Sequence, residues 1–249
     1  MNVHSGISQT AAYDVRDAEK RVSTYDWKAL SEELSDHGCA VMAKLLSPAE
    51  CRQIVELYPD ESHFRSHVHM ARHGFGKGEY RYFKYPLPDL LGGLRAALFP
   101  HLVSVANGWN ERMGINRMYP TSHAQYLKLC HDAGQTRPTP LILRYGEGGH
   151  NALHQDVYGD VAFPLQAVTL LSAAGDFTGG QFVLVEGRPR MQSRAHVIDL
   201  EPGAFLLFPT RHRPVRGSRG HYRAAMRHGV ATVHSGERTT LGLIFHDAT

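Results

Sequence analysis

The chain has 249 residues, of which 42% are hydrophobic and 20% charged, with a net charge of +3. This length is enough to bury a substantial core, and the balance of residue types excludes a disordered or collagen-like chain. No run of about 18 consecutive apolar residues occurs, so the sequence predicts no membrane-spanning helix.

The N-terminal half is predicted to be mainly helical. Residues 1–22 are polar and without periodicity, so we expect them to form a loose arm. Ser47 and Glu50 form a capping box at the start of one helix, and Gly38 ends the helix before it. Residues 39–46 read as a strand between these two helices. The expected helices are residues 25–38, 47–58, 87–114 with an interruption near Pro100, and 122–134.

After Gly134 the pattern changes to short β-rich runs separated by Gly and Pro turns. Several short strands at close spacing are typical of a β-sandwich or barrel. The sequence therefore predicts one domain over residues 23–249, with helical support and a substrate-facing region at 23–135 and a β-barrel core at 136–249. The expected strands are residues 139–146, 152–158, 163–172, 179–187, 195–200, 204–209, 222–230 and 240–245.

The segment "ALHQDVYGD" places an imidazole and a carboxylate two residues apart. Residues i and i+2 of a strand point to the same face, so His154 and Asp156 could reach one metal ion. A site with two histidines and one carboxylate needs a third ligand. His212 follows the strand at residues 204–209, where a barrel could return it to His154. Arg223, at the start of another strand, could hold a carboxylate of the same bound molecule.

These residues carry a resemblance to known enzymes. The segments "LRYGEGGHNALHQD", "TGGQFVLVE" and "FPTRHRPVRGSRGHYR" resemble motifs of alkylation-repair dioxygenases and prolyl hydroxylases, which are Fe(II)- and 2-oxoglutarate-dependent dioxygenases. That likeness covers residues 141–245. The segments "MARHGFGKGEYRYFKYPLP", "AGQTRPTPLILRYG", "RPRMQSRA" and "TLGLIFHDA" extend it over nearly the whole chain, toward a bacterial family of oxygenases described as acting on damaged DNA.

The resemblance implies an α+β fold with a C-terminal double-stranded β-helix, or jelly roll, and supporting N-terminal helices. It implies that His154, Asp156 and His212 hold Fe(II), with 2-oxoglutarate and O₂ as cosubstrates. Arg223 would hold the distal carboxylate of 2-oxoglutarate, and Tyr145 would donate a hydrogen bond to it. The chain would then couple decarboxylation of 2-oxoglutarate to succinate with hydroxylation or oxidative demethylation of a substrate C–H bond.

The sequence departs from the repair enzymes at two positions. Leu143 stands where they have an asparagine, and Gly229 stands where they have a second arginine. These departures leave the cosubstrate class intact but weaken a direct transfer of the repair role. They also leave Arg219 and Arg227 open as alternatives to Arg223. His228 could also compete as a metal ligand. We expect it to lie in the cleft and to form a hydrogen bond with a ligand instead.

Residues 64–86 interleave basic and aromatic side chains. Such a mixture could bind single-stranded nucleic acid, could be a flexible lid over another substrate, or could be a strand pair with aromatics inside and cations in water. The residues that would face a substrate are Arg72, Lys77, Arg81 and Tyr82.

The nature of the substrate stays open at the sequence level. Residues 202–236 hold six arginines and no acid, which favours an anionic ligand. Alkylated nucleic acid therefore competes with a protein side chain or a small molecule, and a non-catalytic barrel that senses a metal or 2-oxoglutarate is the alternative from another class. Cysteines at 39, 51 and 130 show no paired spacing, and no secretory signal is present, so we expect a cytoplasmic location.

Overall fold

The computed structural model of the chain describes residues 15–188 and 190–249. Residues 1–14 of the predicted arm over residues 1–22 lie outside the described residues. Its remainder is not an arm, because helix α1 (Val15–Ser23) begins there. Ala18 and Val22 of α1 are fully buried. The local sequence is polar on average, so only packing against another helix stabilises this short helix.

Four further α-helices follow, and their ends are encoded locally. Asp26 accepts a hydrogen bond from the backbone N–H of Ala29, and Gly38 ends the same helix with a φ of 80°. Ser47 and Glu50 form the predicted capping box. The helices are α2 (Trp27–His37), α3 (Pro48–Glu56), α4 (Asp89–Arg112) and α5 (His123–Asp132).

Helix α4 is continuous, so the predicted interruption near Pro100 is wrong. Proline inside a helix removes one backbone hydrogen bond and costs about 3 kcal/mol. Leu98, Phe99 and Leu102 around it are fully buried. Burial of side chains on both sides of the proline outweighs the local cost.

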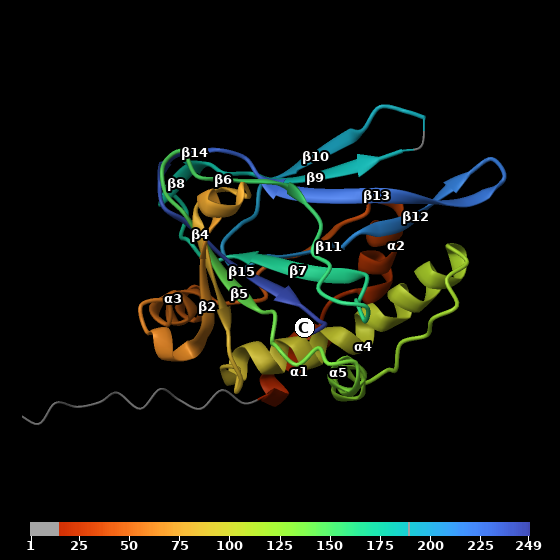
Figure 1. Cartoon of the computed structure of the whole chain (residues 1–249), viewed down its shortest axis with the longest axis horizontal. Helices are drawn as coiled ribbons and strands as arrows, with labels where there is room; N and C mark the ends of the chain where they lie inside the picture. The colour runs from red at the N-terminus through yellow and green to blue at the C-terminus, as the bar shows by residue number, and fades with distance from the viewer. Residues whose placement is uncertain (1–14, 189) are drawn as a thin grey trace, which may run out of the picture.

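The strands form two main sheets (Figure 1). The first has the order β1-β11-β7-β15-β5-β4-β2. Its strands are β1 (Ala40–Met42), β2 (Phe64–His69), β4 (Glu79–Phe83), β5 (Leu141–Tyr145), β7 (Leu165–Leu170), β11 (Phe205–Pro209) and β15 (Arg238–Ile244).

The second sheet has the order β10-β9-β13-β6-β3, with β12 paired to β13, and a short third sheet pairs β14 with β8. Pairing between neighbouring strands of the main sheets is antiparallel. The strands are β3 (Gly76–Lys77), β6 (His150–His154), β8 (Phe177–Gly179), β9 (Phe182–Gly187), β10 (Arg194–Ile198), β12 (His212–Gly217), β13 (Gly220–Val230) and β14 (Val233–Gly236).

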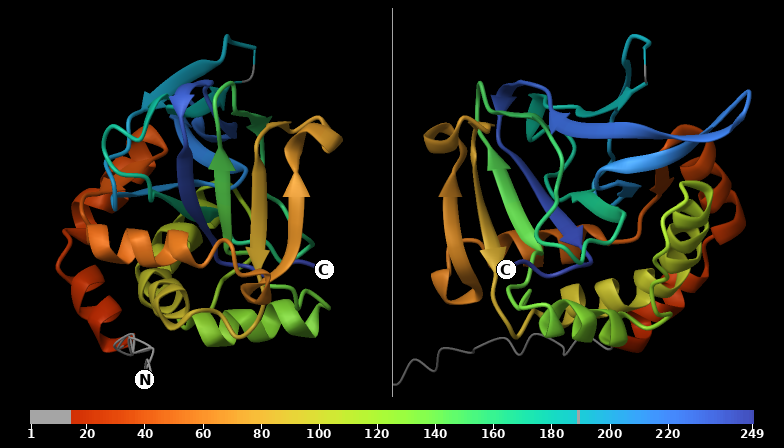
Figure 2. Two further views of the ribbon diagram at one scale, coloured as in Figure 1. Left: turned by 90° about the vertical axis from the view of Figure 1, so that its left-hand side faces the viewer. Right: turned by 45° about the vertical axis from the view of Figure 1, so that its right-hand side comes forward.

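The seven-stranded sheet is covered on both faces. The helices gather on one side of the β-layers, as Figure 2 shows, and the main core lies between them and this sheet. Leu98, Phe99 and Trp109 of α4 pack there with Leu241 and Leu243 of β15. The opposite face meets the six-stranded sheet. This is the predicted α+β jelly roll with helical support.

A short strand of the N-terminal half, β3, pairs with the second sheet. Strands β2 and β4 extend the first sheet, and the turn between them contains the 3₁₀ helix η2 (Met70–His73) and β3. β3 pairs with β6. Another 3₁₀ helix, η1 (Glu61–His63), precedes β2. Among the described residues, no helix is long and apolar enough to cross a membrane.

Candidate metal and cosubstrate site

A cavity of about 360 Å³ lies between the two main sheets. Its walls follow the period of two that β-strands impose, because every second side chain of a strand points to the same face. β15 contributes four consecutive inward positions, and β5 and β4 contribute three and two. These lining residues are Arg238, Thr240, Gly242 and Ile244 from β15, Leu141, Leu143 and Tyr145 from β5, and Tyr80 and Tyr82 from β4.

Three metal-ligating side chains meet in this cavity. His154, Asp156 and His228 each offer one ligand atom, and these atoms all lie within 4.8 Å of one another. Nε2 of His228 is 3.0 Å from Oδ2 of Asp156, and Nε2 of His154 is 3.5 Å from Oδ1. The two imidazole rings are 4.2 Å apart between centroids.

Strand pairing brings these residues together. β13 pairs with β6 so that His228 lies directly opposite His154. The sequence predicted a strand over residues 152–158 that includes Asp156. In the structure β6 ends at His154, so Asp156 lies just beyond the strand. The Asp156 side chain is held by the hydroxyl of Tyr158, which donates a 2.8 Å hydrogen bond to Oδ1. Tyr82 donates in turn to Tyr158 at 3.0 Å.

The pKa shifts of Asp156 and His228 favour metal binding, whereas the hydrogen bond and charge of Asp156 outweigh burial and raise the pKa of His154. Burial raises the pKa of Asp156, but the charge of His228 and hydrogen bonds from both histidines outweigh it and hold the pKa well below its usual range. Burial lowers the pKa of His228. Nδ1 of His154 is 2.8 Å from the carbonyl of Ala152, to which an Nδ1–H donates, leaving Nε2 free to ligate. The site offers one carboxylate and two imidazole nitrogens.

The second histidine of this group differs from the one predicted. His212 is at the start of β12, opposite Ala225, and does not belong to the group. The pairing of β12 with β13 ends where His212 lies opposite Ala225, three residues before His228. Beyond that point β13 pairs with β6, which places His228 opposite His154. The structure therefore corrects the prediction for His212 by placing it outside the group, and it places His228, expected only to support a ligand, within the group.

Arg238 is the buried cation of the cavity. Its side chain is 2% exposed, and its Nη1 atom has no hydrogen-bond partner among the described residues. Its guanidinium carbon is 5.8 Å from the ring centroid of Tyr145 and 5.9 Å from that of Phe177. Burial lowers the pKa of Arg238. Because an unpaired buried cation is costly, such a group is typical of a site for an anionic ligand.

The arginines predicted to bind a carboxylate lie elsewhere. Arg223 donates from Nη2 to the backbone carbonyl of Met113 at 2.9 Å, and its strand partner is Pro214. Arg219 is exposed in the turn between β12 and β13, and Arg227 is exposed on β13. These three side chains do not line the cavity. Their assignment as carboxylate anchors is corrected: Arg219 lies in the turn before β13, the Arg223 guanidinium contacts Met113, and the Arg227 side chain is exposed.

Tyr145 does lie in the cavity, as the resemblance implied. It is 1% exposed, and its hydroxyl accepts a hydrogen bond from Nδ2 of Asn151 at 3.4 Å. Arg238 lies directly opposite Tyr145 in the pairing of β15 with β5. Sequence reasoning missed Arg238, although one signal was present: an arginine begins the apolar run "RTTLGLIF" ten residues after His228 (238 − 228).

Of the four residues predicted to face a substrate, one lines the cavity. Tyr82 does so, and Tyr80 beside it does too. Arg81 alternates with them along β4, so it points to the outer face, where it donates to the carbonyl of Tyr58. Arg72 is exposed on η2, and Lys77 is exposed and donates to the carbonyl of Glu147. Residues 64–86 thus form a strand pair with Tyr80 and Tyr82 on the cavity face, plus a turn whose Gly74 and Phe75 also line the cavity.

The residues present fit iron and 2-oxoglutarate. Two imidazoles and one carboxylate are the donor set of non-haem Fe(II) oxygenases and leave coordination positions open. The unpaired Nη1 of Arg238 and the hydroxyl of Tyr145 fit the far carboxylate of a dicarboxylic acid. Both sets line the same cavity.

Comparison with protein families finds a match over residues 78–248, to the family described as oxygenase, catalysing oxidative methylation of damaged DNA. Two curated relatives, uncharacterized proteins from two strains of Mycobacterium tuberculosis, are 49% identical over 167 residues. That alignment covers 67% of this chain and 72% of each relative.

Solved structures show the same fold. A prolyl-4-hydroxylase from Pseudomonas putida matches with a TM-score of 0.52 and 15% identity, covering 90% of this chain and all of the other. A prolyl hydroxylase from Trichoplax adhaerens, solved with a peptide of a hypoxia-inducible factor, matches with a TM-score of 0.58 and 16% identity over 94% of each chain.

Proposed function

Because the chain belongs to the family of oxygenases described as catalysing oxidative methylation of damaged DNA, we propose that it oxidises a C–H bond of a damaged base in nucleic acid. It is a 2-oxoglutarate-dependent Fe(II) oxygenase. One observation supports the proposal most strongly: a His–Asp–His group shares a single cavity with an unpaired buried arginine.

The chemistry requires few protein groups. When bound, Fe(II) and 2-oxoglutarate would supply the oxidant: O₂ gives one oxygen atom to succinate, formed with loss of CO₂, and the other to the substrate as a hydroxyl. On an N-methyl group the hydroxylated product would lose formaldehyde. His154, Asp156 and His228 would hold the metal, and Arg238 with Tyr145 would hold the distal carboxylate of the cosubstrate.

The surrounding side chains orient these groups and limit water. Tyr158 fixes the Asp156 carboxylate, and the carbonyl of Ala152 fixes the ring of His154. The ring of His228 packs against Phe182 and Phe208, with centroids 5.7 and 4.8 Å away. Aromatic packing on one side and hydrogen bonds on the other leave the ligand atoms little freedom.

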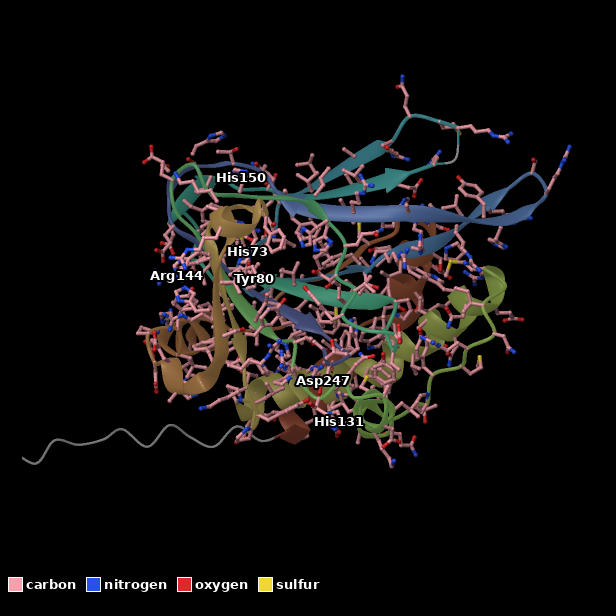
Figure 3. All side chains as sticks on the ribbon, viewed as in Figure 1. His73, Tyr80, His131, Arg144, His150 and Asp247 are labelled. Carbon is pink, nitrogen blue, oxygen red and sulfur yellow. The ribbon has the colours of Figure 1, made fainter. Side chains whose placement is uncertain are left out.

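The cavity rim offers apolar and aromatic groups to a base. Phe75 is 47% exposed and stacks on His73, with ring centroids 5.3 Å apart. Leu153, beside His154, is 48% exposed. Figure 3 places His73 and His150 at the same end of the molecule, above Tyr80. Because His154, Asp156 and His228 line a cavity between the sheets, a base would have to leave the stack to reach them.

Exposed arginines on two hairpins are available for phosphates. The β9–β10 and β12–β13 hairpins extend beyond the body of the sheets (Figure 1). Arg213 is not among the available groups, because it is buried and paired with Glu186. Apart from Arg223, which donates to the Met113 carbonyl, the exposed arginines on or beside these hairpins are Arg190, Arg194, Arg211, Arg216, Arg219 and Arg227. Such cations favour a polyanion over an uncharged peptide.

The test combines turnover with binding. The protein is loaded with Fe(II) and 2-oxoglutarate without oxygen, then O₂ is added and succinate is measured with and without a methylated single-stranded oligonucleotide. We expect the oligonucleotide to raise succinate and to release formaldehyde, and Asp156→Ala to abolish both. The paired change Arg216→Gln and Arg219→Gln should weaken oligonucleotide binding and flatten its salt dependence.

Controls separate the alternatives. Arg52→Gln, an exposed arginine on α3, should leave oligonucleotide binding unchanged. Stimulation by a proline-containing peptide and not by nucleic acid would replace the substrate class with a protein. Binding of 2-oxoglutarate without any succinate would indicate a sensor, and the absence of both would overturn the enzyme.

A further inference from the structure

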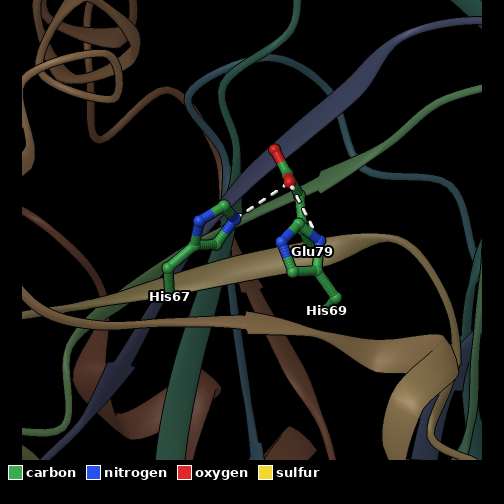
Figure 4. A group of neighbouring side chains, drawn as sticks. All are labelled: His67, His69 and Glu79. Carbon is green, nitrogen blue, oxygen red and sulfur yellow. Dashed lines mark hydrogen bonds and ion pairs between the residues drawn. The ribbon is translucent and has the colours of Figure 1, made fainter.

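A second group of metal-ligating side chains lies on the outer face of the first sheet. His67, His69 and Glu79 each offer one ligand atom, all within 4.8 Å of one another. Figure 4 shows both imidazoles turned toward the carboxylate. The three side chains are between 30% and 43% exposed. Unlike the cavity group, they are open to ions from solvent.

Strand geometry places all three on one face. His67 and His69 are two residues apart on β2, the edge strand of the sheet. The register pairs His69 directly with Glu79 of β4. Side chains at such positions point the same way, so the group follows from the pairing of two strands. Tyr80, the next residue of β4, points to the opposite face and lines the cavity.

The distances fit a tetrahedral ion. Nε2 of His67 is 2.9 Å from Oε2 of Glu79, and Nδ1 of His69 is 3.6 Å from the same oxygen. Ligand atoms about 2.0–2.1 Å from a tetrahedral zinc ion are roughly 3.3–3.4 Å apart. Each of the two histidine–carboxylate distances is therefore within about 0.5 Å of the tetrahedral value. Tyr58 holds the other carboxylate oxygen through a 3.0 Å hydrogen bond, which limits how far Glu79 can turn.

Two arginines near the group have other partners. Arg144 donates from Nη2 to both carboxylate oxygens of Glu237, at 2.5 and 2.6 Å. Arg81 lies 3.5 Å from Nδ1 of His67 and also 3.5 Å from a carboxylate oxygen of Glu61. A metal on Nε2 of His67 moves the proton of that ring to Nδ1, so Arg81 would turn toward Glu61. The positive charges are thus compensated.

We propose that His67, His69 and Glu79 form a second metal site, for a borderline divalent ion of the Zn²⁺ type, at the base of the turn that covers the cavity. The turn begins directly after His69 and ends directly before Glu79. The Met70 N–H donates to the Gly78 carbonyl at 3.0 Å, and Gly74 and Phe75 line the cavity. A bound ion would brace the two strands that hold this turn.

The turn also contacts the strand that carries His154. Strand β3 pairs with β6, and the Ala152 N–H donates to the Phe75 carbonyl at 2.8 Å. An ion bound at the outer site would therefore slow local opening of the turn at residues 70–78. The outer site is independent of the substrate and of the iron group, because it shares no ligand with that group.

The experiment removes the cavity group first. In the double variant His154→Ala with Asp156→Ala, Zn²⁺ binding is measured by calorimetry and by metal content after gel filtration. We expect one ion per chain, and none after a further His69→Ala change. Loss of a direct ligand should weaken binding by more than about 100-fold, since loss of an outer-shell partner alone costs 10–100-fold. His73→Ala, on the same turn but outside the group, is the matched control.

Wild-type protein provides the second measurement. Co²⁺ should bind at two ions per chain, and at one in His69→Ala, which keeps the result decisive if the double variant does not fold. Zn²⁺ should slow amide exchange of residues 70–78 in the double variant. Binding unchanged by His69→Ala, or zero ions in a folded double variant, overturns the site. One ion with unchanged exchange overturns the bracing of the turn.

Discussion

Two arginines are buried equally in this protein but have opposite surroundings. Arg95 of α4 is 1% exposed and Arg238 of β15 is 2% exposed. Arg95 donates from Nε to the carbonyl of Ile244 at 2.9 Å and from Nη2 to Asp247 at 3.0 Å. Arg238 has an unpartnered Nη1 and two aromatic rings nearby.

Arg95, on helix α4, contacts one end of strand β15, and Arg238 is the first residue at the other end of that strand. Arg95 closes the last residues of β15 against the helices, and Arg238 begins β15 at the cavity. Burial raises the pKa of Asp247, but the charge of Arg95 and hydrogen bonds from His131 and Tyr85 bring it below its usual range. Figure 3 places Asp247 and His131 at the far end from His73 and His150. The complete ionic network of Arg95 indicates a structural role, and the missing partner of Arg238 indicates a binding site for an anionic ligand.

Loss of Arg95 should have the largest effect on stability. Arg95→Met leaves the fully buried Asp247 carboxylate without its guanidinium partner. Breaking a buried pair from one side costs about 3–5 kcal/mol. We expect urea denaturation to show a loss of this size in the free energy of unfolding. A loss below about 1 kcal/mol would show that the network around Asp247 is not structural.

Loss of Arg238 should weaken ligand binding and spare stability. Arg238→Met removes a cation that has no charged partner, so the free energy of unfolding should stay equal or rise. Affinity for 2-oxoglutarate, measured by anaerobic calorimetry with Fe(II), should fall at least about 30-fold, which corresponds to about 2 kcal/mol. Arg223→Met is the control and should bind normally. Weakened 2-oxoglutarate binding in Arg223→Met and normal binding in Arg238→Met would show that Arg223 is the carboxylate anchor, as the sequence predicted.

Acid should act on the Arg95 end. Burial lowers the pKa of His123 to about 3 and that of His246 to about 4. Their folded pKa values lie below the unfolded value, so unfolding takes up protons below about pH 6.5 and stability falls as the pH drops. Between pH 7 and 5 we expect a loss of about 2 kcal/mol per histidine.

The acid effect separates the two ends in a second way. Wild type and Arg238→Met should lose the same free energy of unfolding between pH 7 and 5, because the charges that act on both histidines include that of Arg95 and not that of Arg238. His123→Gln should lose about 2 kcal/mol less than wild type over the same range. A pH-independent stability in wild type would show that these rings are not buried in the neutral form.

Local features were predicted well because neighbouring residues encode them. The capping box at Ser47, the helix end at Gly38 and the strands predicted at 139–146 and 240–245 each need only a few consecutive residues. The pairing of His154 with Asp156 is local too, although Asp156 lies past the end of its strand. Helix α1 and the unbroken α4 were not predicted, since both depend on packing against distant segments.

The sequence by itself determined the fold class, the histidine and carboxylate at a spacing of two, and Tyr145 within the cavity strand. Only the tertiary structure decided which of 17 histidines and which distant arginine joined them. His228 and Arg238 reach the cavity because β13 pairs with β6 and β15 pairs with β5. Register between strands separated by tens of residues is set by the packing of whole sheets, and spacing along the chain does not record it.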